Sequence, residues 1–184
     1  MFDTLRDDIR AAMAKDPAAT GVAEVVLTYP GLHAVWLYRL AHRLWGSDHK
    51  LAARLVAHAA RLLTGVEIHP GATVGERLFI DHGMGTVVGE TADIGDDVLL
   101  YHGVTLGGKS MRRTKRHPTL EDGVTVGADA TLIGPITVGE NATVGAGAVV
   151  IDDVPAGATV VGNPAHRVDG DATVSESSAT ASEG

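Results

Sequence analysis

Residues 120–150 read LEDGVTVGADATLIGPITVGENATVGAGAVV, with an aliphatic residue at every sixth position. The same spacing extends toward the N-terminus, with two interruptions. The aliphatic positions are Ile68, Val74, Ile80, Val88, Ile94, Leu100, Leu106, Leu120, Val126, Leu132, Val138, Val144 and Val150. Neither the two-residue period of a strand nor the 3.6-residue period of a helix fits this spacing. A six-residue repeat is typical of a parallel β-helix, in which each hexapeptide forms one flat side and three sides close a coil.

Small residues accompany these aliphatic positions. The repeated pairs are Val74-Gly75, Ile94-Gly95, Val126-Gly127, Val138-Gly139 and Val144-Gly145. Glycine suits a tight corner, because it adopts positive φ without a steric penalty. The alternative is a β-sandwich with evenly spaced strands, but a fixed small neighbour through this many repeats favours the β-helix.

The first part of the chain has helical spacing, as in Leu5, Ile9 and Ala12. Asp16-Pro17 and Pro30-Gly31 interrupt the helices, and Gly65 closes the last one. We therefore expect an α+β protein with helices over residues 1–66 and a β-helix of hexapeptide repeats over 67–168. Residues 169–184 are polar and acidic, so we expect a disordered tail there.

Composition narrows the possible functions. The 184 residues carry a formal net charge of −8, which argues against nucleic acid as a partner. No apolar run is long enough to span a membrane and no leader is recognisable, so we expect no membrane association. Cysteine is absent, which excludes a thiolate nucleophile and favours the cytoplasm.

The residues favour acid–base chemistry over a covalent acyl-enzyme. Ser110 is the single serine of the repeat region, and no G-x-S-x-G motif surrounds it. The candidate bases are His69, His82, His102 and His117. His82 falls at the first interruption of the repeat, and Glu67 precedes it by nearly one coil. A longer interruption, residues 107–119, carries a run of basic side chains.

Several motifs, in order, resemble the serine acetyltransferase family over residues 16–168. They are Asp16-Pro17-Ala18, Tyr29-Pro30-Gly31, Glu67-Ile68-His69-Pro70-Gly71-Ala72, Phe79-Ile80-Asp81-His82-Gly83-Met84-Gly85, Val88-Gly89-Glu90-Thr91, Tyr101-His102-Gly103-Val104-Thr105-Leu106-Gly107-Gly108 and Arg116-His117-Pro118. The resemblance implies a left-handed β-helix and acetyl transfer from acetyl-CoA to the hydroxyl of L-serine, which yields O-acetyl-L-serine for cysteine biosynthesis.

The resemblance also implies a role for individual residues. His82 would be the general base and Glu67 the carboxylate that orients it. Asp16 and Asp81 would bind the ammonium group of serine, and Arg116, with His117 beside it, the carboxylate. A zwitterionic substrate suits paired anions and a guanidinium in one pocket.

Acetyl-CoA is the implied co-substrate, with no metal. Gly108, Ala128 and Ala146 match small residues that admit CoA. His166 replaces the basic residue usual after Gly162-Asn163-Pro164-Ala165, so we assign that phosphate contact to Arg167.

Further expectations concern assembly and partners. The helical region is shorter than in long family members, so we expect a homotrimer with active sites between subunits. L-cysteine should inhibit by competing with serine. Members that dock on the next enzyme of cysteine synthesis, a sulfhydrylase, end in isoleucine. This sequence ends in Gly184, so we expect no such docking.

Three other functions remain as alternatives. A related acyltransferase for a sugar or antibiotic hydroxyl would not need Asp16, Asp81 and Arg116 together. A zinc β-helix would need three convergent histidines, two of them five residues apart, and this spacing is absent. A non-catalytic scaffold would leave the histidines and carboxylates without a purpose.

Overall fold

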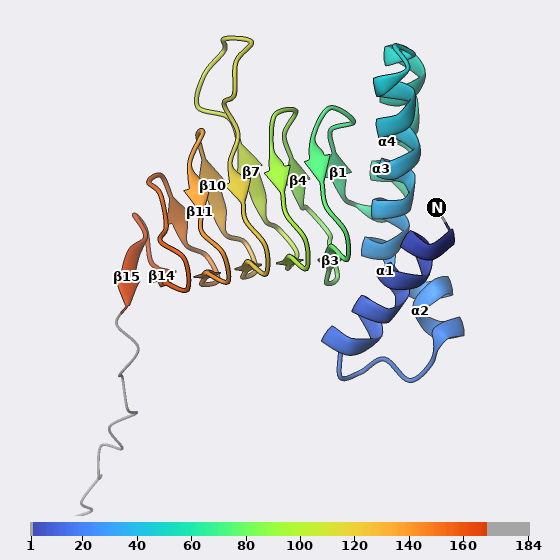
Figure 1. The fold of residues 1–184 in the computed structure, drawn as a ribbon, viewed down its shortest axis with the longest axis horizontal. Helices are drawn as coiled ribbons and strands as arrows, with labels where there is room; N and C mark the ends of the chain where they lie inside the picture. The colour runs from blue at the N-terminus through green and yellow to red at the C-terminus, as the bar shows by residue number, and fades with distance from the viewer. Residues whose placement is uncertain (1, 169–184) are drawn as a thin grey trace, which may run out of the picture.

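The computed structural model describes residues 2–168, so the expected tail and its docking role lie outside the described residues. Four helices come first: α1 (Phe2–Lys15), α2 (Val22–Thr28), α3 (Pro30–Gly46) and α4 (Lys50–Thr64). The strands that follow are β1 (Glu67–Ile68), β2 (Thr73–Val74), β3 (Phe79–Ile80), β4 (Val87–Val88), β5 (Asp93–Ile94), β6 (Leu99–Leu100), β7 (Thr105–Gly107), β8 (Thr119–Leu120), β9 (Thr125–Val126), β10 (Thr131–Ile133), β11 (Thr137–Val138), β12 (Thr143–Val144), β13 (Val149–Val150), β14 (Thr159–Val161) and β15 (His166–Val168). Figure 1 shows the helices at one end of a stack of coils.

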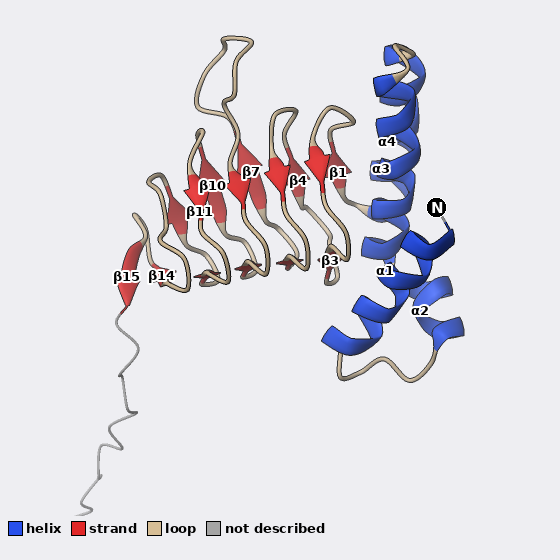
Figure 2. Cartoon of the chain, viewed as in Figure 1, coloured by secondary structure: helices blue, strands red, loops and turns tan. Residues whose placement is uncertain are grey.

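Successive strands turn around the stack and form three sheets. Sheet A has the order β1-β4-β7-β10-β13, sheet B the order β2-β5-β8-β11, and sheet C the order β3-β6-β9-β12-β14-β15. All pairs are parallel except β14 with β15, which closes the last coil. Short strands alternate with corners throughout (Figure 2). The predicted fold, helices followed by a left-handed parallel β-helix, is confirmed.

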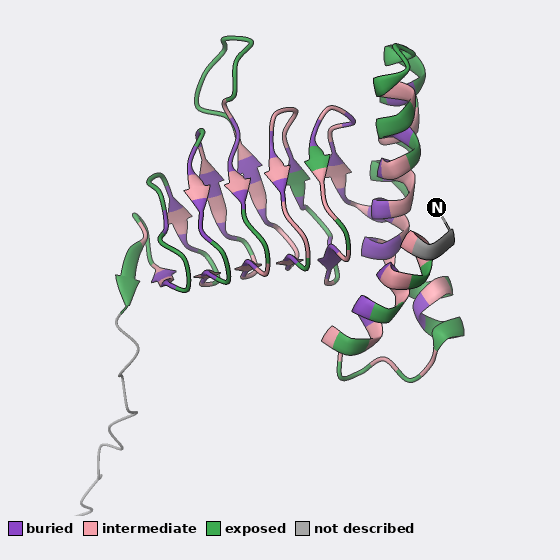
Figure 3. Cartoon of the chain, in the orientation of Figure 1, coloured by how far each residue is buried: buried purple, intermediate pink, exposed green. Residues whose placement is uncertain are grey.

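The aliphatic row of the repeat forms the core. Leu100, Leu106, Val126 and Leu132 are each 0% exposed, and buried residues recur from coil to coil (Figure 3). A second set of buried residues lies in the corners between strands and packs into the same core. It includes Ala92, Val98 and Val124. Val74 differs from the expected pattern because it is only half buried. It belongs to the first coil and lines a surface cavity against α3.

Helix α3 closes the N-terminal end of the β-helix. Ala34, Val35 and Tyr38 belong to the same buried cluster as Ile68, and the Tyr38 hydroxyl donates a hydrogen bond of 2.6 Å to the Ala72 carbonyl. Gly65 ends α4 with a φ of 74°, as expected of a left-handed helix terminus. None of the helices in residues 2–168 combines the length and apolar character that crossing a bilayer requires.

The longest interruption leaves the stack as a protruding loop between β7 and β8 (Figure 1). Most of its side chains are exposed (Figure 3). His117 and Pro118, at its base, are buried again. The loop therefore projects from the corner between sheets A and B.

Candidate active site

His82 lies in the corner between β3 and β4, where the chain passes from sheet C to sheet A. We call this the C–A edge of the β-helix. His82 has a φ of 60° and Gly83 a φ of 77°, so the corner takes two successive left-handed residues. The first interruption of the repeat falls here, and the His82 side chain is 77% exposed. Its ring meets that of His102, from the next coil, edge to face at 6.1 Å.

The start of α3 packs tightly under this corner. A Cβ added at Gly31 would lie 1.9 Å from the carbonyl oxygen of Ile80, so only glycine permits this approach. A Cβ at Gly83 would lie 2.7 Å from the Val66 side chain. The Tyr29-Pro30-Gly31 motif thus brings the start of a helix against the residues that carry His82.

Both oxygens of the Asp16 carboxylate have fixed partners. The amide of Ala18 donates to Oδ1 at 2.7 Å, and the Tyr29 hydroxyl donates to Oδ2 at 2.5 Å. The Tyr29 hydrogen bond is the main cause that lowers the pKa of Asp16, and His82 makes a small electrostatic contribution in the same direction. The same bond raises the pKa of Tyr29 to about 12, with a smaller contribution from Asp81. Asp16 is therefore an oriented anion in the neighbourhood of Asp81 and His82.

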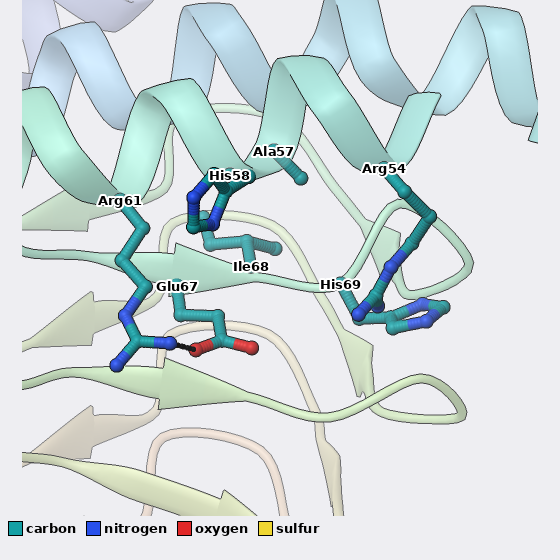
Figure 4. Close-up of a pocket in the computed structure, with 7 residues that line it drawn as sticks. All are labelled: Arg54, Ala57, His58, Arg61, Glu67, Ile68 and His69. Carbon is teal, nitrogen blue, oxygen red and sulfur yellow. Dashed lines mark ion pairs between the residues drawn. The ribbon is translucent and has the colours of Figure 1, made fainter. Parts of the chain in front are cut away.

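Glu67 and His82 line one surface cavity of about 690 Å³ between α4 and the C–A edge. Within this cavity the carboxylate of Glu67 pairs with Arg61 of α4, Oε2 to Nη1, at 3.0 Å (Figure 4). Among the contacts of residues 2–168, the ionic partner of His82 is Asp81, at 3.9 Å. The structure therefore brings Glu67 and His82 to the same cavity, with Glu67 held by Arg61.

Arg116 and His117 lie at a different corner, between sheets A and B, which we call the A–B edge. The Arg116 guanidinium pairs with Glu90 at 2.8 Å, while its Nε is buried without a hydrogen-bond partner in the described part of the chain. The Arg116 backbone amide donates to the Thr91 hydroxyl at 3.0 Å. Arg116 thus holds one unsatisfied donor beside an acidic partner.

His117 is only 7% exposed. Its Nδ1 accepts the backbone N–H of Thr91 at 3.1 Å, so the neutral ring carries its proton on Nε2. Burial, and then the neighbouring Arg116, lower the pKa of His117 below its ordinary value. Gly89 and Gly108 leave room for this ring, since a Cβ at Gly89 would lie 2.0 Å from it. His117 is therefore a neutral hydrogen-bond donor.

The expected CoA residues divide between the same two edges. Ala128 and Ala146 lie in corners between sheets C and A, above His82, and the Gly147 amide bonds the Ala128 carbonyl at 2.8 Å. Gly108 lies on the A–B edge, where its added Cβ would be 3.1 Å from Nε2 of His117. Arg167 lies on β15, at the far end of the stack. Among residues 2–168, His, Asp and Glu side chains form no group suited to hold a metal ion.

Within one chain, sheet A thus separates His82, Asp16 and Asp81 from Arg116 and His117. The sequence predicts one substrate site for both groups, formed between two subunits, but not which residues lie on each edge. Counting strands would have revealed it, since His82 follows a strand of sheet C whereas His117 precedes a strand of sheet B. Tyr29 belongs to a motif that did not reveal its role, and Arg61 belongs to no motif.

The fold and the exposed histidine at its edge define a β-helix transferase. Residues 117–152 match the family model described as bacterial transferase hexapeptide, six repeats. A serine acetyltransferase of Mycobacterium tuberculosis is 56% identical over 168 residues, which are 91% of this chain and 73% of that protein. The chain belongs to the serine acetyltransferase family.

Solved structures of the family superimpose closely. The serine acetyltransferase of Neisseria gonorrhoeae in complex with serine has a TM-score of 0.88 at 40% identity, covering 91% of this chain and 69% of that one. That of Brucella abortus in complex with coenzyme A has a TM-score of 0.89 at 41% identity, covering 91% and 67%. A serine acetyltransferase complex with cysteine has a TM-score of 0.89 at 40% identity, covering 91% and 69%.

Proposed function

We propose that this protein transfers the acetyl group of acetyl-CoA to the hydroxyl of L-serine, with His82 as the general base. The observation that carries the proposal is an exposed imidazole beside two carboxylates, Asp16 and Asp81, at the edge of a hexapeptide-repeat β-helix. Serine, cysteine and coenzyme A complexes of similar proteins support this choice of substrates.

The proposed reaction is a direct transfer. His82 takes the proton of the serine hydroxyl as the oxygen attacks the thioester carbonyl, which forms a C–O bond and a tetrahedral intermediate. The C–S bond then breaks, and the departing CoA sulfur receives the proton from the imidazolium. The products are O-acetyl-L-serine and CoA. Glu67, in the same cavity, would orient the imidazole and stabilise its charged form.

Charge complementarity supports serine as the acceptor. Hydrogen bonds from Tyr29 and Ala18 lower the pKa of Asp16 and orient its carboxylate, so it suits an ammonium group together with Asp81. The Arg116 guanidinium suits the substrate carboxylate. A sugar hydroxyl would need neither of these charges, which argues against the alternative acceptor.

A second copy of the chain would complete the site. The C–A edge carries the base and the ammonium site, whereas the A–B edge carries the carboxylate site. If the C–A edge of one copy faces the A–B edge of the next, all the site residues line one groove, and repetition around a threefold axis closes a trimer. Ala128 and Ala146 from one copy and Gly108 from the other would then admit CoA, with Arg167 near its phosphates.

His117 is a second candidate base because it is buried and hydrogen bonded. Its Nδ1 lone pair is already used by Thr91, and its Nε2 carries the proton, so the neutral ring has no free lone pair. His117 therefore suits a donor to the substrate carboxylate or carbonyl, and His82 remains the base.

The same contacts would hold L-cysteine, which differs from serine only in sulfur for oxygen. We therefore propose competitive inhibition by cysteine. The need for acetyl-CoA, an intracellular metabolite, supports the cytoplasm as the place of action.

The decisive experiment is acetyl-CoA turnover with a panel of acceptors. We expect L-serine to be acetylated in strong preference to sugars and to amino alcohols that lack the carboxylate. His82→Ala should reduce turnover about a hundred- to ten-thousand-fold with an unchanged circular dichroism spectrum. Turnover of His82→Ala close to that of the wild type would disprove the role of His82, and preference for a sugar would disprove the acceptor.

A further inference from the structure

Arg61 is the residue that holds Glu67 in this structure. It lies in the last turn of α4, and its Nη1 is 3.0 Å from Oε2 of Glu67 on β1 (Figure 4). Its side chain is 60% exposed and that of Glu67 36% exposed, so the pair is at the surface of the single chain. The contact crosses from the helical region to the first strand of the β-helix.

Arg61 lies between two cavities. It lines the cavity of about 690 Å³ that contains His82, and also a smaller one of about 80 Å³ beneath α4. Glu67 lines both as well. The ion pair therefore lines both cavities, including the one that contains His82.

A second arginine of α4 provides an internal comparison. Arg54 lines the smaller cavity with Arg61, but its side chain extends toward His69 (Figure 4). Its positive charge contributes to the lowered pKa of His69, after the larger effect of burial. Of these two arginines, Arg61 alone pairs with the Glu67 carboxylate.

The pair leaves half of the carboxylate available. Arg61 occupies Oε2, and the other oxygen of Glu67 points away from the guanidinium (Figure 4). A free glutamate side chain loses rotamer entropy when it is ordered. An ion pair on one oxygen removes part of that freedom beforehand, while the other oxygen can still accept a hydrogen bond from an imidazole.

We propose that Arg61 is a positioning residue, which holds the Glu67 carboxylate in the orientation that His82 requires. The proposal rests on the proposed function, because it assigns Arg61 a role only through Glu67. It predicts an effect on the chemical step and none on substrate binding, since Arg61 touches neither the Asp16 nor the Arg116 group.

The test compares Arg61→Met, Arg61→Lys and the matched control Arg54→Met in the full-length protein. A half-exposed ion pair has a modest effect, so we expect kcat of Arg61→Met to fall about two- to fivefold. KM for serine and for acetyl-CoA should remain unchanged. Arg61→Lys, which keeps the charge, should recover most of kcat, and Arg54→Met should match the wild type. Unchanged or raised kcat in Arg61→Met, or an equal loss in Arg54→Met, would overturn the proposal.

A double-mutant cycle with Glu67→Gln separates this proposal from the proposed function. If Arg61 acts through Glu67, Arg61→Met should have no further effect in the Glu67→Gln background. Additive losses would show that Arg61 acts independently of Glu67 and would overturn the positioning role. If Glu67→Gln alone retains full kcat, the proposal that Glu67 orients His82 is wrong, and the role of Arg61 is overturned with it. Thermal unfolding of each variant identifies any loss of kcat that is due to misfolding. If Arg61→Met is misfolded, Arg61→Gln takes its place.

Discussion

The Tyr29 hydroxyl and the Asp16 carboxylate are joined by a hydrogen bond of 2.5 Å that links the loop after α1 to the start of α3. Tyr29 also stacks on Phe79 of β3, with ring centroids 6.5 Å apart. One tyrosine thus connects three segments that are distant in sequence. Its hydrogen bond lowers the pKa of Asp16 and fixes the carboxylate, which suits recognition of an ammonium group.

Tyr29→Phe should therefore weaken serine binding. Loss of a hydrogen bond to a charged group costs about 1–2 kcal/mol, so we expect KM for serine to rise about five- to thirtyfold, with KM for acetyl-CoA unchanged. Tyr38→Phe is the matched control, because its hydroxyl bonds the Ala72 carbonyl in the core. It should lower the melting temperature and leave both KM values as they are. Steady-state kinetics of the two variants decide between these outcomes.

The proposal that active sites are shared between copies predicts complementation. His82→Ala and Arg116→Ala impair opposite edges of the β-helix, and each should be nearly inactive alone at low serine. If the two are co-expressed and mix randomly in trimers, about a quarter of the sites combine two intact edges. We expect the mixture to regain about that share of wild-type activity. Activity no greater than that of the separate variants would mean that each site belongs to one chain.

L-cysteine should compete with serine and not with acetyl-CoA. Arg116→Ala should weaken inhibition by cysteine about as much as it raises KM for serine, since both ligands offer the same carboxylate. Initial rates measured over a matrix of serine and cysteine concentrations provide the test. A purely non-competitive pattern against serine would place cysteine elsewhere.

Acidification should destabilise the fold through His117, which is buried, and His69, which is partly buried. Burial is the main cause that lowers the pKa of both His69 and His117 in the folded state. Below about pH 6.5 the unfolded chain therefore binds protons that the folded chain does not, so the free energy of unfolding falls as the pH falls. Urea unfolding at about pH 7 and about pH 5.5 should show this loss, and His117→Asn should reduce it. A stability that rises on acidification in this range would contradict the assigned protonation states.

The helices and the β-helix could be predicted from the sequence because their signals are local. An aliphatic residue at every sixth position, such as Leu100, Leu106 and Leu132, points inward wherever the repeat occurs, and each is fully buried. Pro30 and Gly65 marked helix boundaries because their backbone preferences act within one turn. The motifs also indicated the family and its candidate residues.

The partners of the site residues could not be read in this way. Glu67 was expected to orient His82, but its described partner is Arg61, a residue without a motif. The orientation of Asp16 depends on its hydrogen bond with Tyr29, and the close approach of α3 to Ile80 depends on Gly31.

The sequence by itself determined the coil and the residues at its corners, because a hexapeptide repeat fixes the direction of each side chain from its neighbours alone. Only the tertiary structure decided which corners share an edge. It separated His82 from Arg116 across sheet A and brought α4 to Glu67. The physical reason is that hydrogen bonds and ion pairs depend on distances of a few ångströms between segments far apart in the chain, which are set by the stacking of coils and the packing of helices on them.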